Sequence, residues 1–317
     1  MRAFHTFSAS RGGAQLGRAP LGALLALVLG APLACGPKTV PPSPARAVAP
    51  PPSVAATPQE PPWERADTKH TLVDIGWVSV PPKVRHRGGQ YDLLVHFHGG
   101  KDNQVGNVER AGLQAVYVSV NLGNGSSQYG SVYRDPGAWP KLLSHTTKVL
   151  IDEHKLPATG PRRVALSAWS AGFASLKEVL AQPAATELTD AALISDGLFT
   201  SFDKNNAPDL GSYGPVLDFA RRSLRGEKLF VSTHASIPTV GYPDTTQTTY
   251  AVLEHLGLSR VPTPGALGPR GMRRLYEVRE GDLYVAGYEG VTAKDHIDQL
   301  RGMGEAHYRL LEQRWGR

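Results

Sequence analysis

Short apolar runs alternate with amphipathic, helix-like segments along residues 63–317. Continuous apolar runs are typical of parallel strands that are covered on both faces. The predicted strands are residues 71–80, 91–98, 115–122, 163–167, 191–195 and 228–233. The predicted helices are residues 136–153, 171–182, 215–224, 246–256 and 294–314, with a hairpin of residues 275–278 and 283–286 before the last helix. The alternation predicts one α/β domain with a doubly wound, mostly parallel sheet, in which ligands bind beyond the carboxyl ends of the strands.

A different pattern precedes this domain. Residues 1–35 begin with scattered arginines, continue with an uncharged apolar run at residues 21–31, and end in small residues before Cys35. As a helix this run would cover about half of a ~30 Å hydrocarbon core, so it is typical of a secretory signal peptide. The segment around Cys35 resembles a bacterial lipobox, although Leu33 stands two residues before the cysteine where the family usually has leucine three before it. The resemblance implies lipidation of Cys35; ordinary cleavage that leaves a soluble exported protein is the alternative.

Residues 36–62 contain ten prolines and predict an extended tether, because proline fixes φ and lacks a backbone donor. Charge divides at the end of this segment. Residues 1–59 carry five basic and no acidic side chains, whereas the remainder carries 29 basic and 28 acidic ones. The high isoelectric point therefore comes from the leader and gives no support to nucleic-acid binding by the body. Cys35 is the single cysteine of the sequence, which excludes an intrachain disulfide.

The strongest chemical signal is the stretch Ala168-Trp169-Ser170-Ala171-Gly172, which lies between a predicted strand and a predicted helix. A serine in a tight strand-to-helix turn presents its Oγ at a helix N-terminus, where developing negative charge is favoured. Here the chain resembles the α/β-hydrolase superfamily, whose nucleophile elbow is Gly-x-Ser-x-Gly; Ala168 replaces the first glycine. The resemblance implies that Ser170 is a nucleophile. The alternative is a plain helix start that Ser170 caps.

A second match is His96-Phe97-His98-Gly99-Gly100, at the end of the strand 91–98. In the superfamily a His-Gly-Gly stretch supplies one backbone N–H to the oxyanion hole, and the residue after the nucleophile supplies the other. The resemblance implies Ala171 with Gly99 or Gly100, and the sequence does not choose between the two glycines. The competing hypothesis is a metal site. His96 and His98 share a strand face and Asp102 follows, but no third histidine or cysteine lies nearby, so we expect no metal.

The superfamily order of serine, acid and histidine implies His296, after the last strand, as the general base. His234, at the end of the strand 228–233, is the alternative. Asp196, directly after the strand 191–195, is the preferred acid, and Asp244 beyond the next strand is the alternative. Asp295, beside His296, reads as a helix cap. The Gly-, Ser- and Tyr-rich residues 123–139 predict a loop at the same edge, either a pocket wall or a solvated connection.

Together these features predict an exported enzyme of the cell envelope, on the periplasmic or outer-membrane side, that cleaves a small-molecule or polymer carboxylic ester through an acyl-enzyme. This chemistry requires no cofactor. Amide or peptide cleavage uses the same residues. A non-catalytic envelope lipoprotein that binds a glycan or partner on a hydrolase scaffold is the alternative from another class. The sequence carries no indication of oligomeric state.

Overall fold

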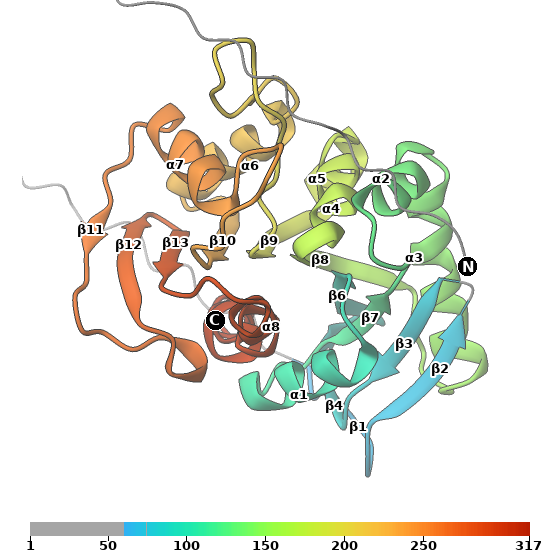
Figure 1. Cartoon of the computed structure of the whole chain (residues 1–317). Coiled ribbons are helices and arrows are strands. Elements are labelled where there is room, and N and C mark those ends of the chain that lie inside the picture. Colours follow the sequence, from blue (N-terminus) through green and yellow to red (C-terminus); the bar gives the residue numbers. More distant parts are fainter. Residues whose placement is uncertain (1–59, 74) are drawn as a thin grey trace, which may run out of the picture. The chain divides into compact units, whose positions relative to one another are not determined.

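A mixed β-sheet runs through the part of the chain that the computed structural model describes, residues 60–73 and 75–317 (Figure 1). Its strands lie in the order β11-β12-β13-β10-β9-β8-β6-β7-β3-β2, with β5 on the side of β6. All neighbours from β13 to β7 pair in parallel, and β2, β3, β11 and β12 add antiparallel pairs at the two sides. The strands are β2 Lys69–Val73, β3 Gly76–Val80, β5 His86–Arg87, β6 Gln90–Phe97, β7 Val116–Val120, β8 Gly160–Trp169, β9 Thr189–Ser195, β10 Leu229–His234, β11 Val261–Pro262, β12 Arg274–Glu280 and β13 Leu283–Tyr288, and a separate pair is β1 Trp63–Glu64 with β4 Lys83–Val84.

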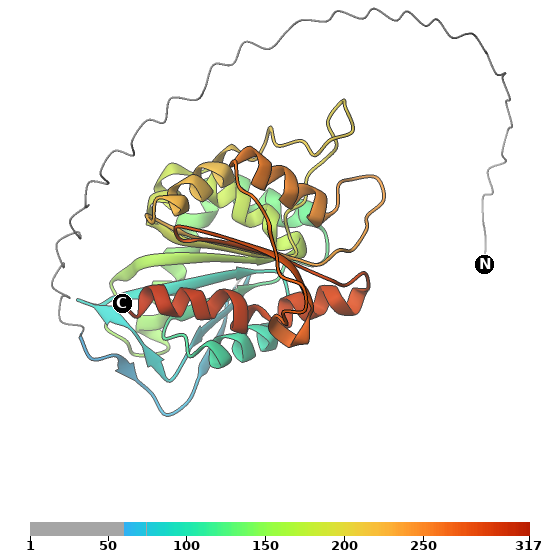
Figure 2. The ribbon, with the colours of Figure 1, turned by 90° about the vertical axis from the view of Figure 1, so that its left-hand side faces the viewer.

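Helices cover both faces of this sheet, as Figure 2 shows. On one face lie α2 Ser126–Arg134, α3 Ala138–Asp152, α4 Phe173–Leu180, α5 Pro183–Leu188, α6 Gly214–Leu224 and α7 Thr245–His255. On the other lie α1 Lys101–Ala111, α8 Ala293–Arg301 and α9 Arg309–Trp315, with a π-helical turn Gly304–Tyr308 between the last two. Short 3-10 turns are Ser170–Gly172 and Pro269–Gly271. The predicted single α/β domain with a doubly wound, mostly parallel sheet is confirmed.

Strand side chains point alternately into two cores, because successive residues of a strand face opposite sides of the sheet. Leu93, Val95 and Phe97 of β6 enter the core beneath α2 to α7, whereas Leu94 enters the core beneath α1, α8 and α9. All four are fully buried. The continuous apolar runs of the sequence therefore reflect strands that are covered on both sides.

Three segments differ from their predictions. The predicted strand 71–80 is a hairpin in which β2 and β3 pair antiparallel, and β3 needs glycine at its start because a Cβ on Gly76 would lie 2.0 Å from the Ser119 carbonyl oxygen. The predicted loop 123–139 contains α2, whose Tyr129 and Tyr133 are buried at i, i+4 spacing. The predicted helix 294–314 is interrupted at Gly304, where a Cβ would lie 2.5 Å from the Asn107 carbonyl oxygen of α1.

The predicted signal segment, residues 1–35 with Cys35, lies outside the described residues, as does the predicted tether up to residue 59. Among the helices within residues 60–73 and 75–317, none combines the length and hydropathy needed to cross a membrane.

Two histidines are built into the core beside the terminal helices. His96 and His307 are each 1% exposed. Burial disfavours the charged imidazolium and lowers the pKa of His96 to about 3 and that of His307 to about 4. Both rings are therefore neutral in the folded protein under ordinary conditions. Unfolding exposes them and restores values near 6.5.

The free energy of unfolding is predicted to fall as the pH drops from about 7 to about 4. In that window the unfolded chain takes up protons on these two histidines and the folded chain does not, which favours unfolding by about 1.4 kcal/mol per pH unit for each histidine. Urea denaturation at a series of pH values measures the slope. His307→Gln should flatten it, whereas His255→Gln, at an exposed position, should not. An equal slope in wild type and His307→Gln would contradict the prediction.

Candidate active site

A strained turn joins β8 to α4. Ser170 follows the last residue of β8 with φ 49°, in the left-handed region that non-glycine residues rarely adopt. The next two residues complete a 3-10 turn, and α4 begins at Phe173. Glycine is required at position 172, because a Cβ there would lie 2.1 Å from the Phe97 carbonyl oxygen of β6. The turn thus has the strand–serine–helix geometry of a nucleophile elbow.

A second strained residue lies at the end of the neighbouring strand β9. Asp196 has φ 44°, and its backbone N–H donates to the Thr233 carbonyl of β10 at 2.7 Å. The next residue, Gly197, lies directly against the elbow; a Cβ there would be 3.1 Å from the Ser170 carbonyl oxygen. The end of β9 is therefore packed against the end of β8, and Asp196 turns sharply away from the sheet at that point.

The carboxylate of Asp196 is 1% exposed and accepts three hydrogen bonds. Its Oδ2 lies 2.6 Å from Nδ1 of His296. Its Oδ1 accepts from the backbone N–H of Ala235 at 3.1 Å and from the hydroxyl of Thr245 at 2.8 Å. With Nδ1–H donating to this carboxylate, the other nitrogen of His296, Nε2, is left with its lone pair free for a proton.

The position of His296 follows from how α8 begins. Thr292 caps the helix by accepting from the Asp295 N–H, and the Asp295 side chain accepts from the Thr292 N–H in return. This confirms the expected capping role of Asp295. The imidazole of His296 then packs against the indole of Trp169, with ring centroids 4.5 Å apart, so the histidine lies beside the elbow.

The His-Gly-Gly stretch lies next to the elbow because of sheet register. Phe97 of β6 pairs with Ala168 of β8, so the residues after each strand emerge side by side. Gly99 has φ 94°, and Gly100 is the residue that precedes α1. Within residues 60–73 and 75–317 no group accepts a hydrogen bond from the backbone N–H of Gly99 or of Gly100. Both amides therefore remain candidates for the oxyanion hole, together with that of Ala171.

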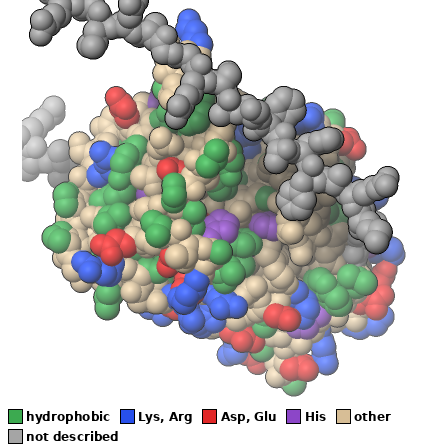
Figure 3. Space-filling model, in the orientation of Figure 1, with side chains coloured by type: hydrophobic (Ala, Val, Ile, Leu, Met, Phe, Trp, Pro, Cys, Tyr) green, Lys and Arg blue, Asp and Glu red, His purple; other side chains and the backbone are tan. Residues whose placement is uncertain are grey.

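Ser170 and Ala171 open into a hollow of about 430 Å³. Loops that follow β7, β9 and β10 supply its other walls: Asn124, Ser126, Phe199, Thr200 and Tyr242. The ring of Phe199 meets that of Tyr242 edge to face at 5.9 Å. Figure 3 shows histidine side chains near the middle of this face with apolar side chains around them. The hollow thus combines an aromatic wall with hydroxyl and amide groups, and Ser170 is among the residues that line it.

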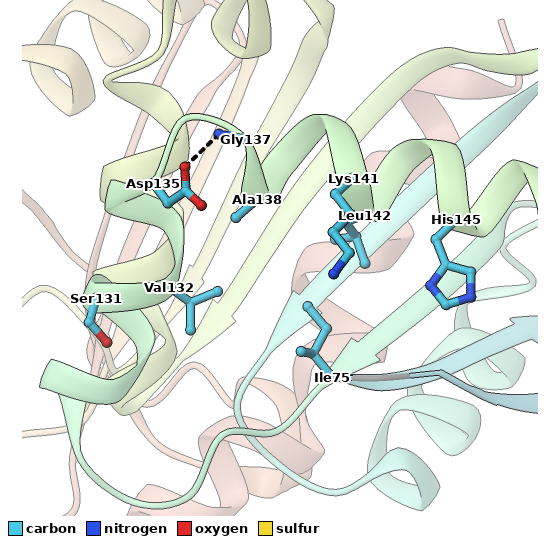
Figure 4. A pocket seen from close by; sticks show the side chains of 9 residues that line it. All are labelled: Ile75, Ser131, Val132, Asp135, Gly137, Ala138, Lys141, Leu142 and His145. Atoms are coloured by element: carbon cyan, nitrogen blue, oxygen red, sulfur yellow. Dashed lines mark hydrogen bonds between the residues drawn. The ribbon is translucent and has the colours of Figure 1, made fainter.

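A second hollow, of about 510 Å³, lies away from these residues (Figure 4). It is walled by α2, α3 and Ile75, with apolar side chains such as Val132 and Leu142 and the polar side chains of Asp135, Lys141 and His145. None of the described residues that line it is a predicted site residue. Size alone therefore does not mark the candidate site in this protein; the geometry around Ser170 does.

The alternative base and acid have other partners. The ring of His234 is buried, with Nε2 2.6 Å from the Tyr276 hydroxyl and Nδ1 2.9 Å from the Ala235 carbonyl oxygen. Burial lowers its pKa. Asp244 caps α7 and accepts from the Gln247 N–H at 2.8 Å. Neither nitrogen of His234 is free to take a proton from a serine without breaking one of these contacts.

The two histidines of the metal hypothesis are engaged within the protein. His96 Nδ1 lies 2.8 Å from the Ser167 hydroxyl, and its Nε2 lies 2.5 Å from the His98 carbonyl oxygen. Asp102 is 94% exposed and pairs with Lys101. In the described part of the chain no group of three or more histidine, cysteine, aspartate or glutamate side chains is arranged to hold a metal ion.

Sequence reasoning missed four residues of the site. Trp169 lies between the rings of His296 and His98, Tyr129 bonds His98, and Thr245 bonds Asp196. Trp169 and His98 stood within the motifs, and only the pairing of β6 with β8 shows that they touch. Tyr129 lies within residues 123–139, which the sequence predicted as a pocket wall or a solvated connection, and Thr245 had no local signal. Both reach the site from the first turn of a helix.

The strand order, the elbow and the helix after it define the scaffold. The fold is α/β-hydrolase-like.

No protein-family model matches the chain, and no curated protein matches it. Solved structures to which the chain shows similarity include an uncharacterised protein from Capnocytophaga ochracea, at 11% identity and a TM-score of 0.45, over 78% of this chain and 63% of that one. A cold-adapted esterase from an Arctic intertidal metagenomic library is 9% identical, with a TM-score of 0.39 over 79% of this chain and 99% of its own. An alpha/beta hydrolase fold protein of unknown function is 13% identical, with a TM-score of 0.29 over 61% of this chain and 82% of its own. This chain thus spans less than two thirds of the length of the Capnocytophaga protein.

Proposed function

We propose that this protein is a serine hydrolase that cleaves a carboxylic ester through Ser170, His296 and Asp196. The observation that carries the proposal is the 2.6 Å contact between His296 Nδ1 and Asp196 Oδ2, made beside a serine held at φ 49°. The contact joins residues 100 positions apart, from the end of β9 and the start of α8. A buried carboxylate on Nδ1 fixes the tautomer in which Nε2 can accept a proton.

The proposed reaction proceeds in two halves. The Oγ of Ser170 attacks the ester carbonyl carbon while Nε2 of His296 takes the hydroxyl proton, and Asp196 stabilises the imidazolium. The amide of Ala171, with that of Gly99 or Gly100, binds the oxyanion. When the intermediate collapses, the C–O bond to the alcohol breaks and His296 returns the proton to the leaving alkoxide. A water molecule, deprotonated by His296, then hydrolyses the acyl-enzyme and frees Ser170.

The hollow beside Ser170 supports an ester substrate of modest size. Its aromatic wall of Phe199 and Tyr242 offers apolar contact, and the side chains of Asn124, Ser126 and Thr200 offer polar groups. The same machinery serves amides, and no feature of the hollow favours that alternative.

Ser170→Ala is predicted to abolish labelling of the protein by a fluorophosphonate probe, because the probe reacts with an activated serine hydroxyl. Ser126→Ala, in the same hollow, should keep its labelling. Mass spectrometry of the labelled wild-type protein should place the adduct on the peptide that contains Ser170. Labelling of undiminished strength in Ser170→Ala, with the fold intact by circular dichroism, would refute the assignment of the nucleophile.

Substitution of the base and acid should lower kcat much more than substitution of the alternatives. His296→Ala and Asp196→Asn are predicted to reduce kcat for a small ester by roughly 10⁴-fold or more, as loss of a triad member does. His234→Ala and Asp244→Asn change residues with other partners and should act through stability, which thermal denaturation measures in parallel. A larger loss of kcat in His234→Ala than in His296→Ala would move the base to β10.

We further propose that the enzyme is exported and anchored to the cell envelope through a lipid on Cys35. The support is positional: Cys35 follows the apolar run 21–31 after three further residues and precedes the proline-rich residues 36–62. At ~3.1 Å per residue a proline helix of that length could hold the enzyme tens of ångströms from the bilayer.

Cys35→Ser is predicted to release the protein from the membrane fraction or to block its maturation, because the thiol is the site of acylation. A chain that begins at Glu60 should be fully active in solution, which an ester assay and fractionation check together. Membrane association that survives in this shortened chain would contradict the anchor, since the folded body would then carry the binding surface itself.

A further inference from the structure

Trp169 contacts two histidine rings at the candidate site. The indole of Trp169 lies nearly parallel to the ring of His98, with centroids 4.8 Å apart and an interplanar angle of 9°. The indole also contacts the imidazole of His296, with ring centroids 4.5 Å apart and an interplanar angle of 34°. The indole Nε1–H also donates to the backbone carbonyl of His296 at 3.0 Å. Trp169 therefore holds both the ring and the backbone of one residue.

We propose that Trp169 is a positioning residue for His296, and that its indole face stabilises the imidazolium which forms when Ser170 gives up its proton. The inference rests on the proposed function for its catalytic consequence. A cation within about 6 Å of an indole centroid is attracted by the negative face of the ring, and tryptophan gives the strongest such contact among the aromatic side chains. The contact is stronger with the charged than with the neutral imidazole, so it favours the transition state.

Besides Asp196, the charged side chains close to His296 along α8 have partners of their own, so they contribute little to stabilising the imidazolium. From β9, Asp196 bonds Nδ1. On α8 itself, Lys294 pairs with Asp298 and Asp295 is engaged in the helix cap. His98, which directly follows β6, contacts the same indole.

His98 completes the stack as a neutral ring. Its pKa is lowered, first by burial and next by the charge of His296. Its Nδ1 lies 2.9 Å from the hydroxyl of Tyr129, which also lies 2.9 Å from the Leu122 amide nitrogen. A neutral, anchored ring against the indole keeps Trp169 in place without adding a second positive charge. His98, the residue before Gly99, therefore supports His296 through its contact with Trp169.

The alternative is that Trp169 only fills space, and the choice of variants separates the two. Trp169→Phe keeps an aromatic face and loses the Nε1 donor, whereas Trp169→Leu loses the aromatic face as well. Trp77→Leu, on β3 at the other side of the sheet, is the matched control for loss of a partly buried indole. Circular dichroism and thermal denaturation identify any variant that fails to fold.

The experiment combines ester kinetics with an NMR titration of the ring protons of His296 in each variant. In Trp169→Leu we expect kcat to fall about tenfold with KM little changed, and the titration midpoint of His296 to move to lower pH by about half a unit, because the charged ring has lost its partner. In Trp169→Phe we expect kcat and the titration midpoint to return most of the way to their wild-type values. In Trp77→Leu both should equal the wild-type values.

Equal behaviour of Trp169→Phe and Trp169→Leu, an unchanged midpoint, or a loss confined to KM would each overturn the inference. The titration does not depend on turnover. If the wild-type protein proves inert towards esters while the midpoint still moves as expected, the proposed function fails and the contact between Trp169 and the imidazolium stands. If the wild-type protein hydrolyses esters and the midpoint stays fixed, the proposed function stands and the contact between Trp169 and the imidazolium fails.

Discussion

The candidate site depends on one close contact between two neighbouring strands. The backbone at Gly172 approaches the carbonyl of Phe97 so closely that any side chain at 172 would collide with it. This contact brings the turn after β8 onto the end of β6, and the strained φ of Ser170 is tolerated because the packing on both sides fixes the turn. The same contact places the stretch that begins with His98 beside the serine. The positions of Ser170 and of the His-Gly-Gly stretch are thus consequences of a single approach of backbone to backbone.

A buried charge is the second constraint. An isolated carboxylate as buried as that of Asp196 would carry a desolvation cost of several kcal/mol, which must be offset by partners with good geometry. Asp196 has three: the amide of Ala235, the hydroxyl of Thr245 and the ring of His296. Two of these belong to the segment after β10 and the third to α8. The carboxylate thereby fixes the relation of those segments to β9, and removal of any one partner would leave a buried acceptor underused.

The elements that the sequence predicted well are those whose signal is local. Continuous apolar runs identified the strands around β8, and the string from Ala168 to Gly172 identified the elbow, since each is readable within ten residues. The errors arose where a distant contact decides the structure. The terminal helix stops at Arg301 and continues as a π-helical turn from Gly304, which lies against Asn107. Helix α2 forms within a Gly- and Ser-rich segment because Tyr129 and Tyr133 are buried there.

The residues named for the triad follow the same division. The order of serine, acid and histidine along the chain pointed to Ser170, Asp196 and His296, and the structure places the last two in contact. The stack of Trp169 on His296 and His98 could not be read from the sequence, because it depends on the register between β6 and β8 and on the angle at which α8 arrives. A pattern of residues specifies which groups are present, and packing specifies which of them touch.

The position in which α8 packs is set by a buried side-chain amide, that of Asn107. Asn107 of α1 is fully buried; its Nδ2 donates to the Leu300 carbonyl at 2.9 Å, and its Oδ1 accepts from the Gly304 N–H at 3.1 Å. Both partners lie on the chain that follows His296, whereas α1 follows Gly100 directly. Asn107 therefore ties the helix that carries His296 to the helix that follows Gly99 and Gly100. Because a buried amide left without its partners is costly, the two helices are held in one relative position. The positions of His296 and of Gly99 and Gly100 are consequently set by the same contact, although these residues lie far apart in the sequence.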